Sequence, residues 1–194
     1  MDEFRNTAKP DDDWWRALWP DPRGTLRALG VTDGSLLDCC CGDGFFTIPA
    51  AALVDGPVYA LDLDPELLDD LDRRAAAADR RVETIRGDAR AVDDLLAERV
   101  GTVLLANTLH GVPEPTELAR RIRAALRDRG RFVVVNWHDR PATETTVLGE
   151  PRGPPEALRM SPDETVAAVE PAGFETVETV ELEPYHYGVV FERA

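Results

Sequence analysis

The feature that most constrains the fold is an apolar segment that runs directly into a glycine-containing turn. Residues 36–48 read Leu-Leu-Asp-Cys-Cys-Cys-Gly-Asp-Gly-Phe-Phe-Thr-Ile, which predicts a buried strand, a turn and the start of a helix. Gly42 and Gly44 have no Cβ atom, so the backbone there can adopt positive φ and come close to a ligand at the amino end of the helix. Asp38 precedes the turn, where its carboxylate can meet a positively charged group. The segment therefore predicts a site for a nucleotide-like ligand.

Two further apolar segments also end on an acidic residue. Residues 58–65 predict a second strand, and its Asp62 lies 18 residues after Gly44. That spacing suits a carboxylate that binds ribose hydroxyls. Residues 82–86 predict a third strand, which is followed by Asp88. Because parallel strands end at one edge of a sheet, we expect the aspartates of these strands to gather there.

These segments resemble the class I S-adenosylmethionine (SAM)-dependent methyltransferases, whose glycine motif is usually written Asp/Glu-x-Gly-x-Gly-x-Gly. The resemblance covers about residues 30–194. It implies an α/β fold, a Rossmann-like three-layer sandwich around a seven-stranded, mostly parallel sheet with an antiparallel C-terminal hairpin. It also implies that SAM is the cofactor and that its methyl group passes to a small-molecule acceptor, as in the ubiquinone/menaquinone biosynthesis-like branch of the family.

The resemblance implies a role for each motif residue. The glycine turn and Asp38 would hold the methionine part of SAM, Asp62 the ribose and Asp88 the adenine. The first motif glycine is Cys40 in this chain, a departure that puts a side chain where the family has none. The implied cofactor-binding residues are Asp38, Cys40, Gly42, Gly44, Asp62, Leu63, Asp88, Ala89 and Asn107.

Two other functions remain open on the sequence. An NAD(P)-dependent oxidoreductase would share the strand, turn, helix and ribose-binding acid, but its motif Gly-x-Gly-x-x-Gly has no counterpart at Thr47. A SAM-binding sensor or scaffold protein without catalysis would share every cofactor residue. Strands predicted at 174–182 and 185–192, joined by a turn at Glu183-Pro184, form the closing hairpin that the methyltransferase fold has and the NAD fold lacks.

The rest of the chain predicts a single globular domain at 30–194, preceded by an N-terminal arm and an aromatic helix at 1–29. That helix either docks on the core or caps the ligand cleft with its aromatic rings. Residues 139–162 are rich in Pro, Gly and Thr and too long for an ordinary connector, which predicts a lid over the substrate. The residues that share one face of the aromatic helix are Trp14, Trp15, Leu18 and Trp19.

Hydrophobic periodicity predicts the remaining elements. Strands at 102–107 and 131–137 would complete the parallel part of the sheet. Asp64 followed by Pro65 predicts a helix start, because Asp caps free amides and Pro fits the first turn. The predicted helices cover residues 65–77, 91–99, 115–129 and 162–170.

Candidate catalytic residues follow from the positions of the histidines. His110, His138 and His186 each come just after a strand or beside the hairpin turn, at the expected ligand edge. A neutral histidine can accept a proton from the methyl acceptor, so we predict His110 or His138 as the base. Tyr185, at the start of the last strand, is a third candidate.

Two lid arginines and one missing motif bear on the acceptor. Arg152 and Arg159 could hold an anionic acceptor by bidentate contacts, or could pair with surface acids. The Asn-Pro-Pro-Tyr signature of base-modifying methyltransferases is replaced by Asn-Thr-Leu-His at residues 107–110. The sequence therefore disfavours the amino groups of DNA bases as targets.

Composition limits the partners. The chain carries 37 acidic and 22 basic residues, a formal net charge of −15 that would repel nucleic acids and anionic membranes. No run approaches the ~18 apolar residues of a spanning helix, and the amino terminus does not read as a signal peptide. We expect a cytoplasmic protein that acts on a small molecule, with a homodimer left open. Lys9 is the only lysine, and this acid-rich, lysine-poor composition suggests a halophilic source.

The three cysteines are consecutive, at residues 39–41. Neighbouring residues of a strand point to opposite faces, so the thiols would not converge on a metal ion, and a vicinal disulfide would be strained. We expect no metal site here and predict small buried apolar side chains in a reducing compartment.

Overall fold

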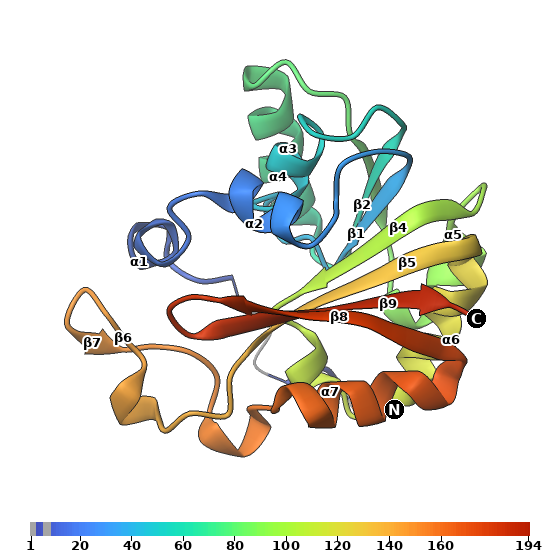
Figure 1. Cartoon of the computed structure of the whole chain (residues 1–194). Coiled ribbons are helices and arrows are strands. Elements are labelled where there is room, and N and C mark those ends of the chain that lie inside the picture. Colours follow the sequence, from blue (N-terminus) through green and yellow to red (C-terminus); the bar gives the residue numbers. More distant parts are fainter. Residues whose placement is uncertain (1–2, 6–8) are drawn as a thin grey trace.

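The computed structural model describes residues 3–5 and 9–194 of the chain. They build one seven-stranded sheet in the order β3-β2-β1-β4-β5-β9-β8, with helices on both faces (Figure 1). Part of the predicted N-terminal arm, residues 1–2 and 6–8, lies outside the described residues. The strands of the sheet are β1 (Leu36–Cys39), β2 (Val58–Asp62), β3 (Glu83–Arg86), β4 (Val100–Ala106), β5 (Leu126–Trp137), β8 (Phe174–Leu182) and β9 (His186–Arg193).

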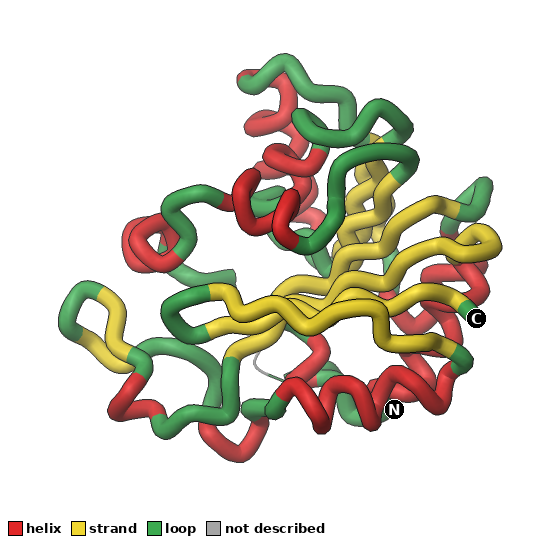
Figure 2. Tube along the Cα trace, in the orientation of Figure 1, coloured by secondary structure: helices red, strands yellow, loops and turns green. Residues whose placement is uncertain are grey.

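Strand direction confirms the expected fold class. The first five strands pair in parallel, whereas β9 runs antiparallel to both β5 and β8. In Figure 2 the strands form one twisted layer between the helices. The predicted closing hairpin is therefore present, and its second strand lies inside the sheet while β8 forms the edge.

The helices cover the sheet in two layers because neighbouring strand residues face opposite ways. Leu36 and Val133 pack with Leu26 of α2 on one face. Leu37 and Val134 pack with the helices α6 and α7 on the other. The helices are α1 (Asp12–Leu18), α2 (Pro22–Ala28), α3 (Thr47–Ala50), α4 (Pro65–Ala77), α5 (Val92–Leu95), α6 (Pro115–Ala125) and α7 (Pro162–Val169).

Several boundaries differ from the sequence-based expectation for local reasons. The helix predicted at 115–129 ends at Ala125, because Leu126 already pairs with Val100 as part of β5. The helix predicted at 91–99 is shorter in the structure, where α5 covers only Val92–Leu95. Helix α2 was not predicted from the sequence; the Asp21 side chain caps its amino end by accepting a hydrogen bond from Gly24 N. The one-turn 3-10 helices are η1 (Ala89–Ala91), η2 (Leu109–Gly111), η3 (Ala142–Glu144), η4 (Glu156–Leu158) and η5 (Glu170–Ala172).

Helix α1 and the predicted lid lie together beyond the carboxyl ends of the parallel strands. Residues 139–162 carry a small hairpin, β6 (Thr146–Val147) with β7 (Glu150–Pro151), which lies on the same side of the molecule as α1 in Figure 1. α1 contacts β6. Trp19 of the same segment is buried in the core cluster of one sheet face. This part of the chain therefore both docks on the core and reaches the lid. No helix in the described residues is long and apolar enough to cross a membrane.

Candidate active site

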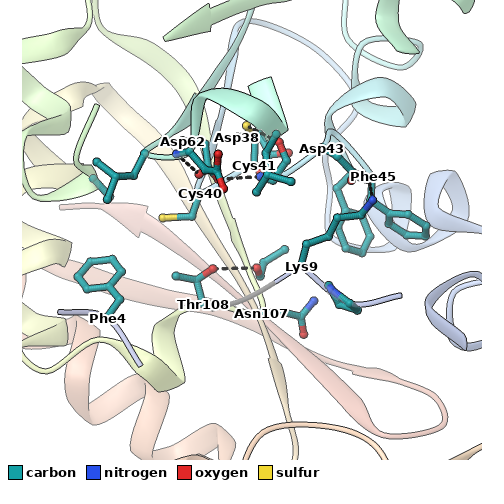
Figure 3. A pocket seen from close by; sticks show the side chains of 18 of the residues that line it. Phe4, Lys9, Asp38, Cys40, Cys41, Asp43, Phe45, Asp62, Asn107 and Thr108 are labelled. Carbon is teal, nitrogen blue, oxygen red and sulfur yellow. Dashed lines mark hydrogen bonds and ion pairs between the residues drawn. The ribbon is translucent and has the colours of Figure 1, made fainter. Parts of the chain in front are cut away.

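A cavity of about 1040 Å³ lies at the carboxyl ends of β1, β2, β3 and β4. That volume is at the upper end of the range for ligand pockets, so it has room for a nucleoside-sized ligand and a second small molecule. Figure 3 shows Asp38, Cys40 and Asp62 on one side of it and Asn107 and Thr108 on the opposite side. The predicted cofactor-binding residues that line it are Asp38, Cys40, Gly42, Asp62, Leu63, Asp88, Ala89 and Asn107.

The two glycines of the turn have different roles. Gly42 has a φ of 56°, and a Cβ atom built there meets no atom within 4 Å, so its side-chain position is open space in the cavity. Gly44 has a φ of 85° and is absent from the cavity lining; a Cβ atom there would lie 2.8 Å from Cγ of Leu71 in α4. Gly42 therefore leaves room for a ligand, and Gly44 allows α4 to pack against the turn.

Cys40 occupies the position of the first motif glycine and adopts the same left-handed backbone, with a φ of 60°. Such a conformation costs a non-glycine residue about 1–2 kcal/mol. Its half-buried side chain lines the cavity; Cys41 also borders the cavity but is buried, and Cys39 is fully enclosed. The expectation of buried thiols thus holds for two of the three cysteines, and the Cys40 thiol faces the space where a ligand would lie.

Asp38 is the most strongly perturbed carboxyl group in the cavity. It is 2% exposed and accepts a 2.6 Å hydrogen bond from Oγ1 of Thr47. Burial raises the pKa of Asp38 to about 7, and the nearby charge of Asp62 adds to this rise. The hydrogen bond from the Thr47 hydroxyl acts in the opposite direction, because it stabilises the carboxylate. A cation that entered the cavity beside Asp38 would stabilise the ionised form of this side chain and so lower its pKa.

The acids after β2 and β3 are held by local hydrogen bonds. Oδ2 of Asp62 accepts from Gly42 N at 2.8 Å, and Oδ1 accepts from Asp64 N at 3.0 Å. Asp88 accepts from the backbone and side chain of Arg90, with 2.9 Å from Arg90 Nε to Oδ1. These Arg90 hydrogen bonds lower the pKa of Asp88. The sequence analysis did not single out Arg90, although its spacing of two residues from Asp88 is a usable signal.

A network of charges closes one end of the cavity. Asp43, in the glycine turn, is 4% exposed and lies 2.6 Å from Lys9 Nζ and 2.7 Å from Arg74 Nη1. Asp12 completes the network, at 3.2 Å from Lys9 and 3.0 Å from Arg74. The hydrogen bond to Asp43 raises the pKa of Lys9. The only lysine thus ties the N-terminal segment to the turn, a contact over more than 30 residues of sequence that no local pattern indicates.

The segment after β4 contributes two polar side chains. Asn107 has a φ of 57°, and its amide oxygen and nitrogen are both enclosed without a hydrogen-bond partner in the described part of the chain. His110 is 6% exposed, lines the cavity and has its Nδ1 3.3 Å from Oδ1 of Asn136. Nδ2 of Asn136 faces Thr165, so Oδ1 is the atom that meets His110. This pairing favours the tautomer with hydrogen on Nδ1 and leaves Nε2 as the basic nitrogen.

The structure does not place His138 or Tyr185 at the cavity. Nε2 of His138 lies 2.8 Å from Oε2 of Glu181, and Tyr185 donates to the carbonyl of Thr146 at 2.8 Å. Neither is among the described residues that line the cavity. His138 follows β5 and Tyr185 precedes β9 as the sequence predicts, but Glu181 of β8 pairs with His138 and the carbonyl of Thr146 in β6 accepts from Tyr185. Of the three predicted catalytic residues, only His110 reaches the site.

His186 belongs to the core and not to the ligand edge. Its ring centroid lies 4.2 Å from that of Trp137 and 4.4 Å from that of Trp19, and the residue is 1% exposed. Burial lowers the pKa of His186 well below its ordinary value. The expectation that all three histidines face the ligand is therefore wrong for His186, because the first residue of β9 turns toward the aromatic cluster under α1.

The fold is similar to those of several known methyltransferases. The fold resembles a SAM-dependent methyltransferase from Aquifex aeolicus, with a TM-score of 0.79 at 20% identity over 95% of this chain and 94% of that one. It also resembles the glycopeptide N-methyltransferase MtfA complexed with SAM, with a TM-score of 0.69 at 20% identity over 89% of this chain and 92% of that one. Residues 36–130 match the family described as a methyltransferase domain.

A third similar structure comes from work on the conversion of a disulfide bond into a thioacetal group during echinomycin biosynthesis. Its TM-score is 0.72 at 19% identity, over 98% of this chain and 85% of that one. No curated protein matches the sequence. The structural likenesses establish the fold, and the domain match shows that residues 36–130 are similar to a methyltransferase domain.

The two turn glycines allow a paired test. Gly44→Ala should lower the free energy of unfolding by about 1–3 kcal/mol, because its Cβ crowds Leu71. Gly42→Ala should lower the affinity for SAM at least ~10-fold with a smaller effect on stability, because its Cβ fills ligand space. Urea denaturation and calorimetric titration measure the two quantities. In a Leu71→Ala background, Gly44→Ala should cost less stability than in the original protein, because the crowded side chain is gone. Equal effects of both glycine variants on SAM affinity would contradict the division of roles.

Proposed function

We propose that this protein transfers the methyl group of SAM to a small-molecule acceptor and leaves S-adenosylhomocysteine (SAH). The observation that carries the proposal is the shared cavity of Asp38, Asp62 and Asp88, which gathers three carboxylates and the glycine turn at one sheet edge. The methyltransferase-domain match over residues 36–130 supports it. The MtfA structure with bound SAM shows that a similar fold accommodates this cofactor.

The residues present fit SAM at three points. The open position beside Gly42 provides space for close backbone approach. Asp38 is a desolvated carboxyl that a cationic group would ionise, and SAM carries both an ammonium and a sulfonium. The enclosed amide of Asn107 lacks a partner in the described residues and would gain one from a polar ligand. We assign the methionine part to the turn and Asp38, the ribose to Asp62 and the adenine region to Asp88 and Ala89.

The residues of the chain position the reactants and remove a proton. SAM supplies an electrophilic methyl group, whose bond to sulfur breaks as the acceptor lone pair forms a bond to carbon. Trp14 and Trp15 of α1 line the cavity and exclude water from it. His110, through Nε2, accepts the proton of an acceptor that carries one, and Asn136 holds its ring. Alignment of the two reactants supplies much of the acceleration.

Finer assignments remain proposals that rest on the sequence. They are the ubiquinone/menaquinone biosynthesis-like branch, a halophilic source, a cytoplasmic location, a homodimer and the division into residues 1–29 and 30–194. The substrate-lid role of 139–162 is supported by the contact between α1 and β6 and by the presence of Pro151, Arg152 and Gly153 in the cavity lining. A non-catalytic SAM sensor is the second candidate, and it would share the cofactor site but show no turnover.

Calorimetric titration with SAM, SAH and NAD tests the cofactor. We expect saturable binding of SAM and SAH and none of NAD. Asp62→Asn should weaken SAM binding at least ~10-fold, because a hydrogen bond to a charged acceptor contributes about 1.5–3 kcal/mol. Asp69→Asn makes the same charge change on the exposed face of α4 and should leave the affinity unchanged. Tight NAD binding would favour the oxidoreductase and sink the proposal.

Affinity for SAM should depend on pH through Asp38. Its pKa of about 7 in the free protein should fall when the cationic ligand binds, so binding releases a proton below that pKa. The dissociation constant should therefore decrease as pH rises from about 5.5 to 7, by up to ~10-fold per pH unit, and then level off. Asp38→Asn should abolish this slope. A slope that persists in Asp38→Asn would assign the titration to another group.

The catalytic role of His110 can be separated from cofactor binding. His110→Ala should slow methyl release to an acceptor by about 10²–10⁴-fold while SAM affinity changes little. His138→Ala is the matched control, since His138 lies outside the cavity lining and pairs with Glu181. Radiolabelled methyl transfer measures the rate. If both variants turn over at the rate of the original protein, the acceptor needs no base from this chain.

A further inference from the structure

The cations that line the cavity differ in whether an acid neutralises them. Lys9, Arg90 and Arg152 are the basic residues in the described lining. Lys9 pairs with Asp43 and Asp12, and Arg90 pairs with Asp88. Arg152 has no ion pair with any described residue, although the chain holds 37 acidic residues against 22 basic ones. Arg152 is therefore the arginine of the cavity lining whose charge is not already matched by a described acid.

The backbone of Arg152 is held by hydrogen bonds, whereas its guanidinium makes no hydrogen bond to any residue that the structure describes. Its backbone N donates to Thr145 O at 2.8 Å, and its carbonyl accepts from Thr145 Oγ1 at 2.8 Å. The side-chain Nε is enclosed without a hydrogen-bond partner among the described residues. The guanidinium carbon lies 5.3 Å from the ring centroid of Trp14. An enclosed N–H group without an acceptor is costly, and a bound carboxylate would satisfy Nε while it pairs with the guanidinium charge.

Arg159, the second lid arginine of the sequence prediction, has a different role. It is 7% exposed, and its guanidinium donates to the carbonyls of Pro154, Arg140 and Arg152 and to Oγ1 of Thr145. These bonds fold the segment that carries Arg152 back on itself. Arg159 is therefore a positioning residue of the lid, and Arg152 is the arginine available to an acceptor.

Aromatic rings surround the space next to Arg152. The ring centroids of Trp14 and Trp15 lie 5.4 Å apart in an edge-to-face pair, and the ring centroid of Phe45 lies 5.8 Å from that of Trp15. All three line the cavity, which Arg152 enters from the lid after β5. The acids proposed for the ribose and adenine follow β2 and β3, on the other side of β1 in the sheet order. The aromatic region and Arg152 thus belong to the part of the cavity left for the acceptor.

We propose that the acceptor is a flat, mostly apolar small molecule with a carboxylate, and that Arg152 determines this specificity. The inference rests on the proposed methyl transfer, which defines the aromatic end as the acceptor side. The rings of Trp14, Trp15 and Phe45 contact the planar body, and the guanidinium fork of Arg152 binds the carboxylate. The stack of Arg152 on Trp14 orients the fork and links recognition of the anion to recognition of the ring.

Calorimetric titration of the SAH-loaded protein with matched acids and amides tests the inference. The probes are 4-hydroxybenzoate against 4-hydroxybenzamide, and indole-3-acetate against indole-3-acetamide. At least one acid should bind ~10-fold or more tightly than its amide, because the amide lacks the charge that the arginine pairs with. The preference should fall as KCl is raised. Equal binding of acid and amide, or no binding of any of the four probes, would overturn the inference.

Substitutions of single arginines test whether Arg152 is the source of the preference for the acid over the amide. Arg152→Gln should bring the acid-to-amide ratio close to one, and Arg152→Lys should retain part of it because the charge remains but the fork is lost. Arg140→Gln, in the same lid and outside the described cavity lining, should leave the ratio unchanged. SAH affinity should be the same in all three variants. A ratio preserved in Arg152→Gln would show that Arg152 only clamps the lid to Trp14.

The two proposals fail separately. Loss of SAH binding in the original protein would overturn the proposed function, whatever the acid probes do. In that case the same acid and amide titrations of the ligand-free protein still report on Arg152, and an acid preference lost in Arg152→Gln would support an anion site in this cavity. SAH binding without any acid preference would overturn the acceptor assignment and leave the proposed methyl transfer intact.

Discussion

The hydrogen bond from Gly42 N to Oδ2 of Asp62 is the contact on which the geometry of the site depends. It joins the turn after β1 to the end of β2, so the loop that would cradle one part of a ligand and the acid that would bind another move as one unit. The bond is possible because Cys40, Gly42 and Gly44 all adopt left-handed backbone conformations. A carboxylate that already accepts from two backbone amides keeps further lone pairs for a ligand and needs little reorganisation to receive it.

Charge is distributed unevenly around this site. Two acids and two bases, Lys9, Arg74, Asp12 and Asp43, pair with one another and fix the N-terminal segment next to the glycine turn. Phe45 and Trp14 lie close to this network in the sequence and line the same cavity. Arg152 lies over the ring of Trp14 and has no acidic partner among the described residues, so its charge remains for a ligand anion.

The sequence contained most of the fold and about half of the site, and the division has a physical basis. Apolar runs, the Asp64 cap and the glycine turn act over short stretches of chain, so strands β1 to β5 and helix α4 were predictable from local pattern. The residues predicted for the cofactor could be expected to share one cavity because strand ends fix their positions. The direction of His138 and His186 was not, since it depends on the partner that each side chain meets across the sheet, Glu181 in one case and Trp19 with Trp137 in the other. The Lys9 to Asp43 contact joins segments with no shared pattern and also required the structure.

The position of β9 has a consequence for how the molecule forms. Because β9 lies between β5 and β8, the strand that precedes it along the chain has no place in the sheet until residues 186–193 arrive. During synthesis the outer hydrogen-bonding groups of β5 stay unpaired while everything before them can already fold, and such an exposed edge can join with other chains. Strand β9 thus seals the hydrophobic layer beneath α6 and α7, so the arrival of this strand also protects the edge of β5.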